Sequence, residues 1–374
     1  MKLKKIVALG AAVGVALSGV VLATSASAEP VSNSYVAVGS DTLQDSMNAL
    51  INGTNASGSF VRVKGGFNTL GNFDAFGSAA IQTTSGGTFF ARPAGSGQGR
   101  DALFRSIDGA SWSVVGNTTP GRSIAGQVDI ARSSSGPGSN ANAAGKVLYV
   151  PYGRDALAYA YKGGTPAWAN LTAAQLKSIY EGTLTSIDGV TVTPKLPQSG
   201  SGTRSFFTTA IGVATNPAGV PDAATTTLPE NDATVLGDNQ IIPFSVANWI
   251  SQANNVSGVN TLAAAPTVQL GSAVSGQVPF TGTAPSLVPG AGYYASTSFG
   301  RDTYLIVQRS RVEAGFSGTK PFDPVLAALV DPTKTNSLTN FGTLAFNPGA
   351  VKKKFGFLAP SSTTPIAAYA GLAG

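Results

Sequence analysis

The sequence contains no cysteine and no histidine. Without cysteine the chain can form no disulfide bond and carry no lipid on an N-terminal cysteine, so its stability must come from buried apolar surface. Without histidine, the Ser-His-Asp and Cys-His catalytic systems and most zinc sites are excluded. No HExxH, Walker A or EF-hand motif occurs either, so we expect no metal and no cofactor. A hydrolase that uses Ser-Lys or paired carboxylates stays open.

The first 28 residues have the pattern of an export signal. Lys2, Lys4 and Lys5 precede an apolar run over residues 6–22, and the small residues Ala26-Ser27-Ala28 follow it. This pattern predicts a secreted protein, cleaved after Ala28 and free of a lipid anchor. The alternative is that the apolar run is retained as a membrane anchor.

The charge of the chain indicates no polyanionic partner. The formal net charge is +6, but three lysines belong to the leader, so the processed chain carries only about +3. An excess this small favours neither nucleic acid nor a membrane surface. Residues 29–374 are numerous enough to form two lobes, each with its own core.

Short apolar strands alternate with helical stretches, which is typical of an α/β protein. A strand is expected over 34–39 before a helix over 42–51, and another over 147–150. The clearest helix covers residues 172–181, with Thr172 as N-cap and Gly182 as the stop.

Three glycine-rich turns each precede a predicted helix: residues 39–42, 95–99 and 200–203. The first backbone N–H groups of a helix are unpaired and lie at the positive end of its dipole, so such a turn can bind an anion. A single turn of this kind is ordinary helix initiation in most proteins. Three turns with hydroxyl residues favour a binding site, because a desolvated oxyanion needs several converging donors.

Arginine side chains lie close to these turns. Arg132 follows an apolar strand, and its fork could hold two oxygens of a tetrahedral anion; Arg204 and Arg92 are further candidates. For each arginine the alternative is a structural ion pair. Asp41 could accept the proton of a partly protonated anion, or it could simply cap its helix.

The tripeptide Gly-Arg-Asp occurs three times, at residues 99–101, 153–155 and 300–302. The spacing is uneven and matches no repeat architecture. We interpret the recurrence as coincidence combined with surface ion pairs.

Taken in order, these motifs resemble the phosphate-binding protein of the bacterial phosphate ABC transporter, in its divergent actinobacterial form. Residues 39–42 and 95–97 are similar to the first two phosphate turns of that family, and residues 128–134 to its strand ending in Ser-Asp. Residues 171–182 resemble its "LT-x-x-Q-L-x-x-I-Y-x-G" helix, and residues 200–203 its "D-G-S-G-T" turn. The resemblance runs from about residue 36 to residue 250.

The resemblance implies an α/β, two-lobed type 2 periplasmic-binding-protein fold with two crossing hinge segments. It implies no catalysis, inorganic phosphate or a similar oxyanion as ligand, an ABC transporter permease as partner, and a monomer. The ligand-binding residues it implies are Ser40, Asp41, Thr42, Ser96, Gly97, Arg132, Ser133, Ser134, Ser201, Gly202, Thr203 and Arg204.

Two departures from the family pattern concern charge. The family has an arginine three residues before the first glycine of the third turn, where this chain has Pro197. The family also has an aspartate that accepts the phosphate proton, where this chain has Ser134. Our hypothesis is that Arg132 and Arg204 replace the missing charge and Asp41 the missing acceptor.

The resembled topology predicts crossings near residues 149–161 and 293–307, both read as strand-like runs. Lobe one would comprise residues 31–152 and 303–374, and lobe two residues 153–302. Two other functions stay open: a secreted phosphatase or esterase on the same scaffold, and a binding protein used for adhesion or signalling.

Overall fold

The computed structural model describes residue 30 and residues 35–372. The predicted export signal and its cleavage site lie outside this range. Within the described residues, no helix is long and apolar enough to cross a membrane.

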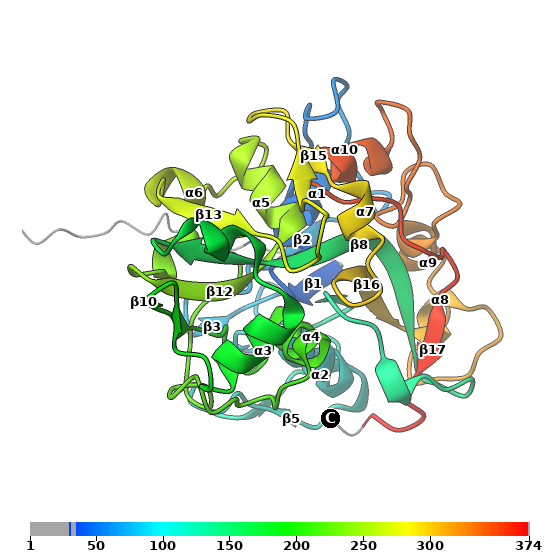
Figure 1. Cartoon of the computed structure of the whole chain (residues 1–374). Coiled ribbons are helices and arrows are strands. Elements are labelled where there is room, and N and C mark those ends of the chain that lie inside the picture. Colours follow the sequence, from blue (N-terminus) through cyan, green and yellow to red (C-terminus); the bar gives the residue numbers. More distant parts are fainter. Residues whose placement is uncertain (1–29, 31–34, 373–374) are drawn as a thin grey trace, which may run out of the picture.

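Strands and helices alternate along much of the chain, which confirms the predicted α/β class (Figure 1). The strands are β1 (Tyr35–Gly39), β2 (Leu70–Asn72), β3 (Ala80–Ile81), β4 (Phe90–Ala91), β5 (Ser111–Trp112), β6 (Arg122–Ser123), β7 (Ile130–Ser133), β8 (Val147–Lys162), β9 (Ser186–Ile187), β10 (Val190–Thr191), β11 (Thr193–Pro194), β12 (Gln240–Ser245), β13 (Val268–Gly271), β14 (Phe280–Thr281), β15 (Val288–Pro289), β16 (Gly300–Gln308) and β17 (Ile366–Ala368). The α-helices are α1 (Gln44–Asn52), α2 (Ser96–Asp108), α3 (Ala173–Tyr180), α4 (Gly202–Ile211), α5 (Val246–Ala253), α6 (Thr261–Ala264), α7 (Ala291–Tyr294), α8 (Arg309–Val312), α9 (Pro324–Val330) and α10 (Pro348–Lys354), and short 3-10 helices are η1 (Gly138–Asn140), η2 (Pro166–Asn170) and η3 (Ala233–Val235).

Nine of these strands form one mixed sheet in the order β11-β12-β8-β16-β7-β1-β2, with β13 and β17 also paired to β8. The long strand β8 connects the two ends of the sheet. Its first part pairs with β16 and β17, and its last part pairs with β12 and β13. Strands β8 and β16 run antiparallel through the middle of the molecule, with a register shift at Thr303/Tyr304.

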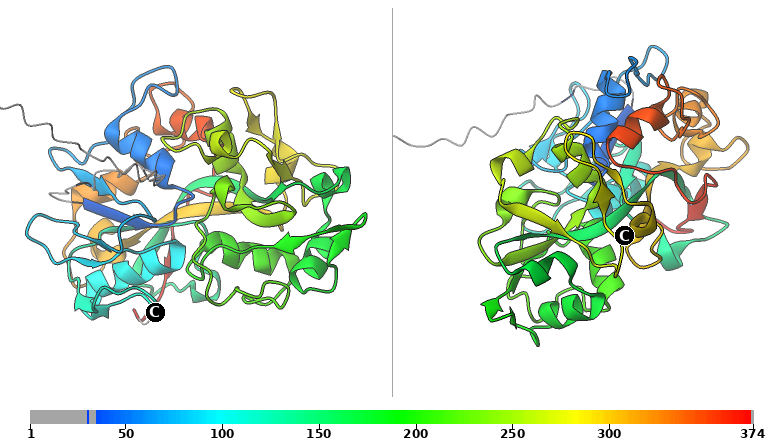
Figure 2. Two further views of the ribbon diagram at one scale, coloured as in Figure 1. Left: turned by 90° about the vertical axis from the view of Figure 1, so that its left-hand side faces the viewer. Right: turned by 45° about the horizontal axis from the view of Figure 1, so that its top comes forward.

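The apolar cores divide the chain in the same way. One core is filled by side chains from residues 156–299. Two others pack on the opposite end of the sheet and take their side chains from residues 35–152 and 305–368, together with Ala247. We call the part around the latter two cores the first half and the part around residues 156–299 the second half (Figure 2, left view).

Local sequence signals explain the helix boundaries. Helix α3 begins as predicted after Thr172, whose hydroxyl accepts from Gln175 N while the Gln175 side chain accepts from Thr172 N. This reciprocal capping box satisfies two backbone donors that the helix itself leaves unpaired. The strand-like reading of residues 293–307 was wrong in its first part, because residues 291–294 form α7 and the strand begins at Gly300.

Candidate anion-binding site

The structure brings the three glycine-rich turns together. Strands β1 and β7 are parallel neighbours, so the turn after Gly39 and the segment after Arg132 leave the same edge of the sheet. The second turn joins them through a bridge between Gly39 and Ala94. The third turn arrives from the second half, and Gly97 N donates to Gly200 O at 3.3 Å.

Glycine permits this close approach. Gly95 has a φ of +94°, in the region that only glycine adopts without strain. A Cβ atom on Gly202 would lie 2.4 Å from both Ser96 Oγ and Ser134 Oγ. The start of α4 therefore rests directly on the hydroxyls of the first half.

Hydroxyl groups from both halves surround this contact. Ser96 Oγ lies 3.0 Å from Ser134 Oγ and accepts from Ser134 N at 3.0 Å. Ser40 Oγ is buried and finds no hydrogen-bond partner in the protein. Two predicted residues are already engaged locally: Ser201 Oγ caps α4 by accepting from Arg204 N, and Ser133 Oγ donates to Ser135 O.

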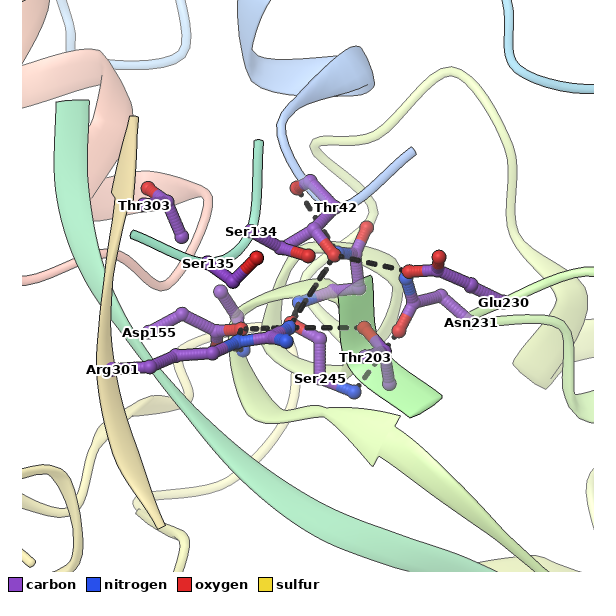
Figure 3. A network of polar contacts seen from close by, with 12 residues as sticks. Thr42, Ser134, Ser135, Asp155, Thr203, Glu230, Asn231, Ser245, Arg301 and Thr303 are labelled. Atoms are coloured by element: carbon purple, nitrogen blue, oxygen red, sulfur yellow. Dashed lines mark hydrogen bonds and ion pairs between the residues drawn. The ribbon is translucent and has the colours of Figure 1, made fainter. Parts of the chain in front are cut away.

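The cation of this site is Arg301, which the sequence analysis missed. It lies on β16, is only 3% exposed, and forms a buried ion pair with Asp155 of β8 at 2.9 Å. Its Nη2 also donates to Thr203 Oγ1 at 3.1 Å and to Thr42 Oγ1 at 3.4 Å (Figure 3). Its Nη1 is buried without a partner. One guanidinium thus contacts hydroxyls of both halves and keeps a free donor.

The recurring Gly-Arg-Asp tripeptides account for this ion pair. Where β8 and β16 run antiparallel, Arg301 stands opposite Asp155 and Asp302 stands opposite Arg154. The two tripeptides therefore form two reciprocal ion pairs, of which Arg154–Asp302 is the more exposed. The interpretation of the recurrence as coincidence was wrong for these two copies.

Glu230 and Asn231 of the second half also reach the first turn. Glu230 is buried and accepts from Thr42 Oγ1 at 3.5 Å, and Asn231 Nδ2 donates to Asp41 Oδ1 at 3.2 Å. Asn231 is itself fixed by Ser245 N, which donates to its Oδ1 at 2.9 Å. Burial and the nearby Glu230 carboxyl raise the pKa of Asp41 well above its usual range, although part of its side chain stays exposed.

Arg132 is placed differently from the prediction. Its fully buried guanidinium donates to four backbone carbonyls and to Asn72 Oδ1, so every one of its N–H groups is engaged. The accepting carbonyls belong to Ala37, Gly39, Ser40 and Phe73. Burial lowers its pKa to about 10, so it remains charged at neutral pH. Arg132 holds the backbone of the first turn in place and has no donor left for a ligand.

Replacing Arg132 with methionine should therefore lower the stability of the protein. Several buried carbonyls would lose their donor at once, and we expect the free energy of unfolding to fall by at least about 3 kcal/mol. Urea denaturation measures this change, with exposed Arg122→Met on β6 as the control. A variant of unchanged stability that binds anions poorly would return Arg132 to the ligand-binding set.

Arg204 and Arg92 are also used within the protein. Arg204 donates to Pro197 O, Thr215 O and Asn216 Oδ1, on loops flanking α4. Arg92 donates to Asp74 O and to the backbone and hydroxyl oxygens of Ser78. Both guanidiniums are bound to these neighbouring groups. The structure places Arg301, and not the guanidinium of Arg204, in contact with the hydroxyls of Thr42 and Thr203, so Arg301 replaces Arg204 in the hypothesis on the missing charge.

The site thus consists of two halves that share crossing strands, with hydroxyls, helix starts and a buried guanidinium between them. The chain belongs to the PBP superfamily, because the sequence model of the PBP superfamily domain matches residues 24–317. The predicted periplasmic-binding-protein fold is confirmed by this match.

Two of the solved structures that are similar to this chain share little of its sequence. A Vibrio cholerae ABC-type phosphate transport receptor is 15% identical, with 75% of this chain and 88% of that chain covered and a TM-score of 0.43. A phosphate-binding protein from Stenotrophomonas maltophilia is 13% identical, with 88% and 91% covered and a TM-score of 0.45. A comparison with curated proteins found no match.

Proposed function

We propose that this chain is a secreted solute-binding protein that captures phosphate between two lobes and presents it to an ABC transporter permease. Lobe one would comprise residues 31–152 and 303–374, and lobe two residues 153–302. The export pattern of residues 1–28, with cleavage after Ala28, and the absence of cysteine support a secreted protein without a lipid anchor.

The observation that carries the proposal is the free Nη1 of Arg301 beside hydroxyls from both halves. Buried polar groups are normally hydrogen-bonded, so unpaired donors that gather in one place indicate a polar ligand. The charge of Arg301 is balanced by that of Asp155. The anion would therefore be held mainly by neutral donors, together with the one guanidinium that Asp155 also binds. The proposed binding residues are Ser40, Asp41, Thr42, Ser96, Gly97, Ser134, Ser201, Gly202 and Thr203, with Arg301 and Glu230 added.

The carboxyl groups at the site favour an oxyanion that carries a proton. An ionised carboxylate can accept a hydrogen bond from the hydroxyl of hydrogen phosphate, whereas the bare oxygens of sulfate would repel it. Asp41 and Glu230 stand beside Thr42 and could accept such a bond. They would replace the aspartate whose position Ser134 occupies.

Isothermal titration of the purified protein with phosphate and with sulfate tests the proposal. We expect phosphate to bind at least tenfold more tightly than sulfate, a difference of about 1.4 kcal/mol. Equal affinities would remove Asp41 and Glu230 from the acceptor role. Native mass spectrometry that finds an uncharged organic solute bound, or rapid hydrolysis of a chromogenic phosphate ester, would contradict the proposed function.

A further inference from the structure

The segments around Asp41 and Glu230 meet between the two halves. Asp41 precedes α1 in the first half. Glu230 and Asn231 belong to a loop of the second half, where Glu230 faces Thr42 (Figure 3). Three hydrogen bonds cross here: Asn231 to Asp41 at 3.2 Å, Thr42 to Glu230 at 3.5 Å, and Asn248 Nδ2 to Thr42 O at 3.1 Å. We call the residues of these hydrogen bonds, Asp41, Thr42, Glu230, Asn231 and Asn248, the latch. The bonds join the two halves, so they require that the halves lie together.

The latch contains two carboxyl groups and no cation of its own. Glu230 Oε1 is buried and finds no donor in the protein, while Glu230 Oε2 accepts from Thr42, the neighbour of Asp41, and Asn231, the neighbour of Glu230, donates to Asp41, so the two carboxyl groups belong to one small cluster. Two carboxylates can only accept, so a hydrogen bond between them requires that one carries a proton. Without that proton the pair would be repulsive and would leave a buried acceptor unsatisfied.

The surrounding charged groups do not remove the need for a proton between the two carboxyl groups. Asp45, on α1, acts on Asp41 as a further negative charge, and its own carboxyl is bound to the Ser257 hydroxyl. Of the nearby guanidiniums, Arg132 on β7 is engaged by carbonyls and Asn72. Arg301 on β16 is engaged by Asp155, and its Nη2 reaches the latch through the Thr42 hydroxyl at 3.4 Å. Asp74, which acts on Asp45 and Arg132, adds another negative charge.

We infer that the two lobes close over the anion together with one proton, which Asp41 and Glu230 share across the cleft. This inference rests on the proposed function and adds its regulation by pH. The proton bridges two carboxyl oxygens, and no covalent bond other than O–H changes. The raised pKa of Asp41, caused first by burial and then by Glu230, agrees with this arrangement.

The direction of the pH effect follows from the linkage between closure and protonation. When the lobes separate, water solvates Asp41 and its pKa falls back toward its ordinary value. The closed state therefore binds more protons than the open state, and closure is favoured as the pH falls. Between the ordinary pKa and the raised pKa, affinity for the anion should fall by up to tenfold for each unit of pH.

Glu230→Gln tests the inference, because the amide can donate to Asp41 without any proton from solvent. Phosphate affinity is measured by isothermal titration from pH 5 to pH 8.5 for the natural protein and for the variant. Dividing the affinity of the natural protein by that of the variant removes the part of the phosphate titration that is common to both proteins. We expect the affinity of the natural protein, divided by that of the variant, to fall by up to tenfold for each unit of rising pH. On binding phosphate, the natural protein should take up as much as one proton more than the variant.

Two further variants complete the experiment. Asp41→Asn should behave as Glu230→Gln does, and it serves in place of Glu230→Gln if that variant does not fold. Glu181→Gln, at an exposed ion pair with Lys177, should keep the natural pH dependence. A ratio independent of pH would overturn the inference while leaving phosphate binding intact. If the natural protein binds phosphate at no pH, the proposed function itself fails.

Discussion

Replacing Arg301 with lysine should weaken phosphate binding about a hundredfold. A lysine ammonium has its three N–H donors on one nitrogen. The guanidinium contacts Asp155 and Thr203 through Nη2 and offers a donor to the anion from the separate Nη1, a spread that one nitrogen cannot reproduce. Loss of one charge-assisted hydrogen bond costs about 1.5–3 kcal/mol, which corresponds to a ten- to hundredfold change in affinity or somewhat more. Arg301→Met should abolish binding altogether, and it should also destabilise the fold because Asp155 would be left as an unpaired buried charge.

Isothermal titration with phosphate measures the loss, and thermal denaturation shows whether the variant is folded. Arg154→Lys is the matched control, since Arg154 forms the reciprocal ion pair with Asp302 on the same two strands and otherwise donates to Tyr294 O. Its affinity should stay within about threefold of the natural value, a difference of roughly 0.6 kcal/mol. If both arginine variants lost affinity equally, the effect would belong to the strand pair and not to the free donor of Arg301.

Replacing Gly202 with alanine should weaken binding by about ten- to hundredfold, or about 1.4–2.7 kcal/mol, without destabilising the protein. The added methyl group would lie 2.4 Å from Ser96 Oγ and Ser134 Oγ, which prevents the start of α4 from reaching the first half. Alanine is also a better helix former than glycine, by up to about 1 kcal/mol. Stability and affinity should therefore change in opposite directions.

Titration with phosphate and thermal denaturation of Gly202→Ala check both parts of this prediction. Gly258→Ala provides the control, because a Cβ atom at this loop position would meet nothing within 4 Å. Small-angle scattering with saturating phosphate should show a more extended particle for Gly202→Ala than for the natural protein. Unchanged affinity would mean that the anion is bound without this contact between α4 and the first half.

The sequence predicted those features that depend on neighbouring residues. The capping box of α3 and the glycine turns are local patterns, and the meeting of the turns after β1 and β7 follows from the parallel arrangement of strands. The roles of the arginines could not be predicted in this way. Whether the donors of Arg132 are free depends on carbonyls that its own segment does not contain.

Arg301 and Glu230 were missed for the same reason. Arg301 is far from every glycine turn in the sequence and reaches the site only because β16 pairs with β8. Glu230 directly precedes Asn231-Asp232, which resembles the family's "N-D" segment, but the role of Glu230 itself depends on the approach of the first turn from the other half. The one available signal was the pair of Gly-Arg-Asp tripeptides on two predicted crossing strands, whose opposite directions bring each arginine to an aspartate.

Strand β16 lies in the middle of the sheet, between β8 and β7, and Arg301 is near the point where its register shifts. If the halves rotate about these crossing strands, residues near the axis travel least, while Ser201, Gly202 and Thr203 at the start of α4 travel further. The attraction of Arg301 for a negative ion is then nearly the same before and after rotation, while the neutral donors of α4 approach or withdraw. Because Asp155 balances the charge of Arg301, arrival of the anion should depend only weakly on salt concentration, whereas its residence time should depend on how closely α4 packs against Ser96 and Ser134.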